Sequence, residues 1–160
     1  MPRRYWLMKS EPNRFSIDDL RAAPQGIAPW DGARNYQARN LLRDRVKAGD
    51  GVLFYHSGTA TPGIAGIAEV VRAGYPDHTA WEANGEQFDP KSTPARPVWY
   101  MVDVRFVEKF RQLIPLAKLK TTPGLEGMEV ARRGSRLSVQ PVSRSEWEIV
   151  RRIARNMDPG

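Results

Sequence analysis

The sequence predicts an α+β domain with a small mixed or barrel-like sheet and short flanking helices. The 160 residues are enough for one domain with its own hydrophobic core. About five or six short segments have the apolar or alternating pattern of strands, and short helical segments interrupt them. Strands and helices do not alternate in βαβ order, which argues against a doubly wound sheet. We expect residues 1–160 to form a single domain.

The first part of the chain contains one strand signal and two helix signals. Residues 5–8 (YWLM) are a run of bulky apolar side chains, which indicates a buried strand. Ser16 and Asp19 have the spacing of a capping box, so a short helix begins after Ser16. Asn35 has the position of an N-cap for a second helix that runs to about Val46.

The middle of the chain favours strands. Residues 52–55 and 63–71 are apolar, and the second segment alternates glycine and alanine with isoleucine. We expect something large to pack closely against that segment. Residues 75–97 are polar and proline-rich and form a long loop, and such loops in compact domains are often functional. Residues 98–110 predict the longest strand, because alternate side chains are apolar.

The last part of the chain predicts a short strand and a final helix. A helical turn near Pro115 precedes a strand at residues 137–140. Ser143 and Glu146 form a second capping box, which begins a helix with Trp147 on its inward face.

The charge of the chain suggests a polyanionic partner. The formal net charge is +7 and the isoelectric point is near 10.0. A folded domain with an isoelectric point above about 9 is typical of nucleic-acid binding. The alternative is that this is simply one of many small basic proteins.

Composition also excludes several classes of protein. The chain contains no cysteine, which excludes a disulfide scaffold, a cysteine nucleophile and a thiolate metal site. The apolar run near the N-terminus is too short for a signal peptide, and no other run reaches membrane-spanning length. We therefore expect a soluble cytoplasmic protein with no membrane partner.

No catalytic motif stands out. His56 and His78 are the only histidines, and neither has a metal-ligand partner at the usual spacing. The chain has no nucleophile-elbow motif and no phosphate-binding P-loop. The glycines of residues 63–68 lack the spacing of a dinucleotide-binding turn. We expect a protein that is not an enzyme and that holds no metal and no cofactor.

Four aromatic residues have polar or cationic neighbours that suit the recognition of a nucleobase. Trp30, Tyr36, Tyr55 and Trp99 accompany small polar side chains and Arg34. A nucleobase stacks on indole or phenol with about 1–3 kcal/mol per stack, and amides and hydroxyls can pair with its edge.

Trp30 is the most ambiguous of these aromatic residues. It lies between Pro29 and the turn dipeptide Asp31-Gly32, and not on an apolar stripe. From the residues alone, Trp30 can be either a core side chain or the wall of a pocket.

Seven segments of the chain, in order, resemble the EVE domain family. They cover nearly the whole sequence: YWLMKSEP (5–12), WDGARNYQARN (30–40), FYHS (54–57), GIAGIAEVV (63–71), FDPK (88–91), WYMVDV (99–104) and RLSVQPVS (136–143).

This resemblance implies a PUA-like fold, a small mixed β-barrel with flanking short helices. It also implies a non-catalytic module that binds nucleic acid and takes a flipped modified base into an aromatic pocket. The base is expected to be a modified cytosine of DNA, such as 5-methylcytosine, although RNA is a further possible partner. The domain is expected to act as a monomer.

The resemblance and the aromatic pattern together give a set of candidate site residues. The base pocket is expected to contain Trp30, Lys9, Ser10, Asn35, Tyr36, Tyr55, His56, Ser57, Asp89 and Trp99. The phosphates are expected to contact Arg34, Arg39, Arg43 and Lys47, on or beside the helix that follows Asn35.

Two alternatives remain open at this point. One is an RNA-binding adaptor of PUA type without a preference for modified bases. The other is an enzyme that acts on a nucleotide, with His56 or Asp89 as general base.

Overall fold

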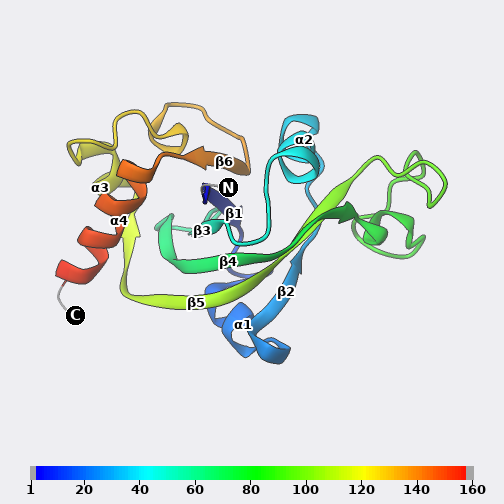
Figure 1. The fold of residues 1–160 in the computed structure, drawn as a ribbon, viewed down its shortest axis with the longest axis horizontal. Helices are drawn as coiled ribbons and strands as arrows, with labels where there is room; N and C mark the ends of the chain where they lie inside the picture. Colours follow the sequence, from blue (N-terminus) through cyan, green and yellow to red (C-terminus); the bar gives the residue numbers. More distant parts are fainter. Residues whose placement is uncertain (1–2, 158–160) are drawn as a thin grey trace.

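The computed structural model describes residues 3–157, which form a six-stranded sheet with short helices on both faces (Figure 1). The strand order is β2-β5-β4-β3-β1-β6. The β1–β3 pair is parallel and the other pairs are antiparallel, so the sheet is mixed as predicted. The strands are β1 (Tyr5–Ser10), β2 (Ile27–Trp30), β3 (Gly51–His56), β4 (Gly63–Pro76), β5 (Tyr100–Pro115) and β6 (Val139–Val142).

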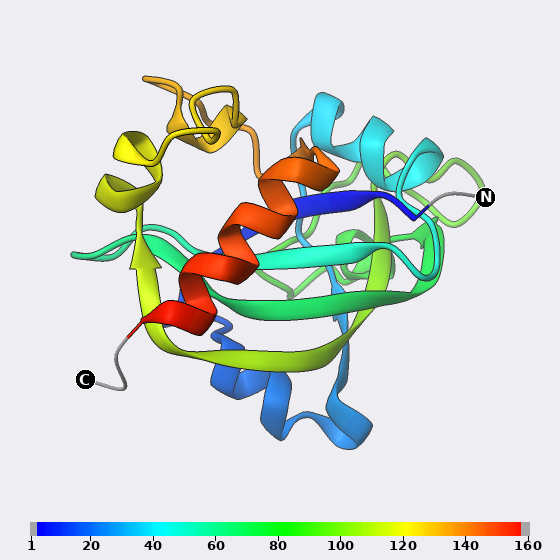
Figure 2. The same ribbon diagram turned by 60° about the vertical axis from the view of Figure 1, so that its left-hand side comes forward.

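The predicted barrel is not confirmed, because the sheet is open. Within residues 3–157, β2 and β6 are its two edges and do not pair with each other. The sheet still curves strongly, since β4 and β5 are 14 and 16 residues long and their pairing contains several register shifts (Figure 2). Such bulges bend a strand and increase its twist. The sheet therefore curls without bringing its edges together.

Each edge strand contains a proline. Pro29 lies in β2 opposite Asp103 of β5, and Pro141 lies in β6 opposite Trp6 of β1. A proline has no backbone N–H to contribute to a ladder, so edge strands are where a sheet tolerates it.

Three of the four α-helices begin at the predicted capping residues, and the other begins directly after a proline. The helices are α1 (Ile17–Ala22), α2 (Tyr36–Asp44), α3 (Leu116–Thr121) and α4 (Arg144–Asn156). The capping boxes at Ser16 and Ser143 are both formed, and the Asn35 side chain accepts a hydrogen bond from the Ala38 amide. The predictions of these three helix starts are confirmed, although α2 ends slightly before Val46.

Two hydrophobic cores lie on opposite faces of the sheet. Alternate residues of β1 and β3 enter opposite cores, so Phe54 belongs to the first core and Tyr55 to the second. Helices α1 and α2 cover the first core. Helix α4 covers the second with Trp147, as predicted, and Figure 2 shows this helix lying across the sheet.

The small residues of β4 are explained by the backbone of β5. A Cβ atom on Gly66 would lie 2.2 Å from the Glu108 carbonyl oxygen, and one on Gly63 would lie 2.2 Å from that of Ile114. The predicted close approach to this strand is therefore present, and it is made mainly by the backbone of the neighbouring strand β5.

Candidate base-binding site

A cavity of about 570 Å³ opens where β1 and β2 end. It is lined by residues 9–11 at the end of β1, residues 14–15 before α1, residues 28–32 at the end of β2, and residues 86–87 of the loop between β4 and β5. We call this space the Trp30 cavity. It brings Lys9, Ser10 and Trp30 together, three of the residues that the sequence nominates for a base pocket.

Trp30 is at once a core residue and a wall of this cavity. Its side chain is only 8% exposed, and its ring meets the ring of Phe54 edge-on with centroids 5.1 Å apart. It is also the last residue of β2 and one of the residues that line the cavity. The two interpretations of Trp30 that the sequence leaves open therefore both describe this side chain.

Lys9 and Ser10 form the β1 side of the Trp30 cavity. The Ser10 hydroxyl donates to the Phe15 carbonyl oxygen at 2.6 Å, which ties the end of β1 to the turn before α1. The Lys9 ammonium donates to the Ser135 carbonyl oxygen at 3.4 Å and lies 5.9 Å from the centre of the Tyr55 ring. Burial lowers the pKa of Lys9, while the charge of Glu129 opposes this shift.

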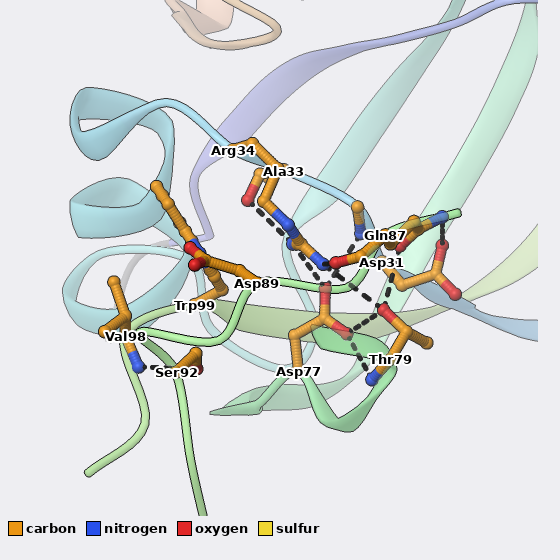
Figure 3. Close-up of polar contacts among 11 residues, drawn as sticks. Asp31, Ala33, Arg34, Asp77, Thr79, Gln87, Asp89, Ser92, Val98 and Trp99 are labelled. Carbon is orange, nitrogen blue, oxygen red and sulfur yellow. Dashed lines mark hydrogen bonds and ion pairs between the residues drawn. The ribbon is translucent and has the colours of Figure 1, made fainter. Parts of the chain in front are cut away.

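A buried ion pair fixes the segment that follows Trp30. Arg34 pairs with Asp77 at 3.0 Å, and the Asp77 side chain is 0% exposed. The same carboxylate accepts a hydrogen bond from the Gly32 amide at 2.8 Å. Burial would raise the pKa of Asp77, but hydrogen bonds from Thr79, Gly32 and Arg34 hold it below its usual value. The contacts among these residues are drawn in Figure 3.

Gln87 connects this ion pair to the Trp30 cavity. The Arg34 guanidinium donates to the Gln87 carbonyl oxygen at 2.7 Å, and the Thr79 hydroxyl lies 2.8 Å from the Gln87 amide oxygen. The Gln87 amide nitrogen then donates to Asp31 at 3.4 Å (Figure 3). The sequence marks the loop of residues 75–97 as functional, but it gives no signal that singles out Gln87, and it treats Asp31 only as a turn residue.

A second group of predicted residues lies beside the cavity lining and is not part of it. Tyr36 stacks on Trp99 with ring centroids 5.0 Å apart, and the Trp99 indole N–H donates to Asp89 at 2.7 Å. This hydrogen bond, together with the Lys91 amide, lowers the pKa of Asp89. The Arg34 guanidinium lies 5.5 Å from the centre of the Trp99 ring, so the group backs onto the buried ion pair.

The three predicted residues at the end of β3 also lie outside the cavity lining. Tyr55 is 3% exposed and belongs to the core on the opposite face of the sheet. The His56 Nε2 atom accepts a hydrogen bond from the Ile17 amide at 3.1 Å, and the Ser57 amide donates to the Ser10 carbonyl oxygen at 2.9 Å. These contacts hold the start of α1 and the end of β1 in place beside the cavity.

The His56 contact predicts a pH dependence of stability. Burial lowers the pKa of His56 below its ordinary value of 6.5, and a protonated Nε2 cannot accept the Ile17 hydrogen bond. This contribution to stability is fully present above the unfolded-state pKa and is lost as the pH falls through the lowered folded-state pKa. We expect His56→Gln, which offers an acceptor that does not titrate, to lose less unfolding free energy than the wild type between about pH 8 and about pH 5. Urea unfolding curves with the same pH dependence for both proteins would contradict this.

The four predicted phosphate contacts differ in how strongly they are already engaged. Arg34 is committed to Asp77. Arg39 donates to the Val98 carbonyl oxygen at 2.9 Å, and Arg43 pairs with the adjacent Asp44 at 2.8 Å. Lys47 is exposed but lies in the lining of a different cavity.

Two further cavities lie near the beginning of β1. Their volumes are about 470 and 720 Å³, and they share Arg3, Arg4 and Arg45 in their linings. The Trp30 cavity lies at the other end of the same strand. The positive charge around these two cavities is therefore separated from Trp30 by the length of β1.

Ion pairs join two segments that line the Trp30 cavity. Arg14 lies 3.3 Å from Glu11 and 3.5 Å from Glu86, and all three side chains are exposed. Arg14 therefore connects the turn after β1 to the loop that carries Gln87.

The part of the chain from residue 3 to residue 157 contains no cluster of three or more histidine, aspartate or glutamate side chains that could hold a metal ion. In the same part, every helix is too short or too polar to span a bilayer.

Comparison with known proteins places the chain in a family. The EVE domain profile matches residues 4–153. Thymocyte nuclear protein 1 of Homo sapiens is 45% identical over 163 residues, which cover 91% of this chain and 72% of the human protein. The crystal structure of human THYN1 in complex with 5-methylcytosine-containing DNA has a TM-score of 0.89 at 42% identity, and the match covers 97% of this chain and 99% of that chain. The structure of a hypothetical protein from Leishmania major has a TM-score of 0.91 at 49% identity, and the match covers 96% of each chain. This chain therefore belongs to the EVE domain family.

Proposed function

We propose that this protein is a non-catalytic module that binds DNA and takes a flipped, modified cytosine into the Trp30 cavity. The observation that carries this proposal is the cavity itself, where an indole wall and polar side chains lie together. Its volume of about 570 Å³ falls within the usual range of small-molecule sites. The human relative that was crystallised with 5-methylcytosine-containing DNA supports the choice of ligand.

The energetics of this proposal depend on stacking more than on the methyl group. Extruding a base from a duplex costs a few kcal/mol. Stacking on Trp30 would contribute about 1–3 kcal/mol, and hydrogen bonds to the base edge would offset the rest. Burying one methyl group adds about 0.8 kcal/mol, which corresponds to roughly a fourfold preference over unmodified cytosine.

The contacts and positions of the two candidate general bases, His56 and Asp89, support a function without a catalytic step. His56 accepts the Ile17 amide, and Asp89 accepts the Trp99 indole N–H. Neither side chain is part of the Trp30 cavity lining. Incubation with modified oligonucleotides should therefore give binding without any change in the DNA.

The direct test is a binding series on one duplex in which a single position carries cytosine, 5-methylcytosine or 5-hydroxymethylcytosine. All measurements use the same salt concentration, because salt shifts the whole affinity scale of nucleic-acid binding. We expect tighter binding to the modified duplexes than to plain DNA. Unmodified structured RNA that binds as tightly as modified DNA would instead support the RNA-adaptor alternative. A cytoplasmic location and a monomeric state are further parts of the proposal.

The phosphate contacts are proposed to lie beside Lys9 as well as on α2. Lys9 lines the Trp30 cavity and touches Ser135, and the exposed Arg133 and Arg136 flank that serine. On α2, by contrast, Arg39 and Arg43 are paired within the protein. The loop around Ser135 therefore offers cationic side chains next to the cavity.

Salt titration distinguishes these two sets of cations. Arg133→Ala and Arg136→Ala are each expected to weaken binding to modified and plain DNA alike and to reduce the slope of log affinity against log salt by about 1. Lys47→Ala is the corresponding variant for the α2 side, because it removes one exposed charge outside the cavity lining. If Lys47→Ala changes the slope and the two arginine variants do not, the phosphates contact the α2 side of the molecule.

A further inference from the structure

Asp31 is an acidic residue of the Trp30 cavity lining and directly follows Trp30 in the chain. The residue is half-buried, and it lines the cavity together with Trp30. Within residues 3–157, its one side-chain hydrogen-bond partner is the Gln87 amide nitrogen, at 3.4 Å. That distance is long for a hydrogen bond to a carboxylate.

The buried carboxylates elsewhere in this protein are far better supplied with donors. Asp77 accepts from Gly32, Arg34 and Thr79, each within 3.0 Å. Asp50 is 4% exposed and accepts from the Trp6 indole and from the amides of Arg4 and Lys47. Of these three carboxylates, Asp31 therefore has the most unused acceptor capacity, and it is the one whose residue lines the cavity.

The effect of burial on Asp31 agrees with this count of donors. Burial raises the pKa of Asp31, and the single hydrogen bond from Gln87 lowers it only in part. A donor that enters the cavity and binds the ionised carboxylate would stabilise its charge. The site thus favours a ligand that brings an N–H group to this position.

Gln87 keeps the carboxylate in place. Its backbone carbonyl accepts from Arg34 at 2.7 Å and its amide oxygen lies 2.8 Å from the Thr79 hydroxyl (Figure 3). These two contacts hold Gln87 while its amide nitrogen donates to Asp31. Arg34 and Thr79 are in turn bound to the buried Asp77. This chain of contacts runs from the protein interior to the cavity wall.

Cytosine and thymine differ at the position where such a carboxylate would act. The exocyclic N4 amino group of cytosine is a donor, whereas the O4 atom of thymine is an acceptor. A carboxylate has only acceptors, so it attracts the first and repels the second. Thymine also carries a methyl group on the same ring carbon as 5-methylcytosine. The methyl group and the stacking face therefore cannot distinguish these two bases.

We propose that Asp31 is the specificity-determining residue of the Trp30 cavity, where it accepts a hydrogen bond from the N4 amino group of the flipped base and so selects cytosine over thymine. This inference depends on the proposed function, because it requires a base in the cavity. In this proposal, Trp30 recognises the ring of the modified base by stacking, and Asp31 recognises its edge by a hydrogen bond.

The test compares 5-methylcytosine and thymine at one position of the same duplex, each opposite an abasic site. The abasic partner removes base pairing from the cost of extrusion for both bases. Binding is measured by fluorescence polarisation for the wild type, for Asp31→Asn and for Glu82→Gln. The asparagine side chain has nearly the shape of aspartate, but its amide can turn to pair with either base. Glu82→Gln removes the same charge from an exposed position of the loop between β4 and β5, outside the cavity lining.

We expect the wild type to prefer 5-methylcytosine over thymine by about tenfold. In Asp31→Asn this preference should fall to within about twofold, while Glu82→Gln should keep it. Thermal unfolding of the three proteins checks that each one is folded.

Three outcomes would overturn the inference. If folded Asp31→Asn keeps the full preference, Asp31 does not read the base, although a modified-base site at Trp30 would still stand. If Glu82→Gln loses the preference as well, the effect is one of general charge. If the wild type binds modified and plain duplexes equally in the binding series that tests the proposed function, that function itself fails, and this result is separate from the first two.

Discussion

Trp30→Ala is expected to lower the free energy of unfolding by about 3–5 kcal/mol, the usual cost of removing a large aromatic side chain from a core. The indole is 8% exposed and its ring packs edge-on against Phe54 in the first core. Truncation therefore leaves a hole beside Phe54 and removes the stacking wall of the cavity at the same time. Urea unfolding monitored by circular dichroism measures the loss of stability.

Trp30→Phe separates the two roles of this residue. Phenylalanine restores most of the packing against Phe54 and still offers a ring for stacking. We expect this variant to remain folded and to bind modified DNA more weakly than the wild type by a part of the roughly 1–3 kcal/mol that one stack contributes. A loss of less than about 1 kcal/mol in Trp30→Ala would show that the indole is not a core side chain. Undiminished binding by folded Trp30→Phe and Trp30→Ala would remove Trp30 from the site.

Arg34→Ala is the second variant with a large expected effect. It would leave Asp77, whose side chain is 0% exposed, without its cationic partner. Breaking a buried ion pair by removing one partner costs about 3–5 kcal/mol, because an uncompensated charge stays buried. The variant also removes the donor that binds the Gln87 carbonyl oxygen at 2.7 Å, so the cavity wall should loosen. Urea unfolding again gives the loss of stability.

The double variant Arg34→Ala/Asp77→Asn is the control for this interpretation. It removes both charges, and the asparagine can still accept the hydrogen bond from the Gly32 amide. We expect it to be more stable than Arg34→Ala alone. If the double variant is no more stable than the single one, the loss of stability in Arg34→Ala comes from the other contacts of the guanidinium and not from the unpaired Asp77 carboxylate.

Helix starts and strand faces could be predicted from the sequence because their causes are local. The capping boxes at Ser16 and Ser143 and the Asn35 cap each involve side chains within three residues of one another. The alternation that sends Phe54 and Tyr55 to opposite faces depends only on the period of a strand. Such signals are complete within a short window of sequence.

Contacts between distant residues could not be predicted in this way. The sequence predicts a phosphate contact for Arg34, but its partner Asp77 lies 43 residues away, and a lone arginine in a sequence does not reveal such a partner. Gln87 lies 56 residues from Asp31 and reaches it only because the loop after β4 folds back towards the end of β2. The open sheet could not be predicted for the same reason, because the pairing of β2 with β5 joins strands that are far apart in the chain.

The prolines of the two edge strands have a consequence for how copies of this protein meet. The free edge of a sheet exposes backbone groups that can template pairing with another chain, and this is a common route to aggregation. Pro29 in β2 and Pro141 in β6 each remove one donor from such a template, and each of these strands is only four residues long. Strand β2 is thus a poor template for strand pairing between copies of this protein, although it ends with the aromatic side chain of Trp30.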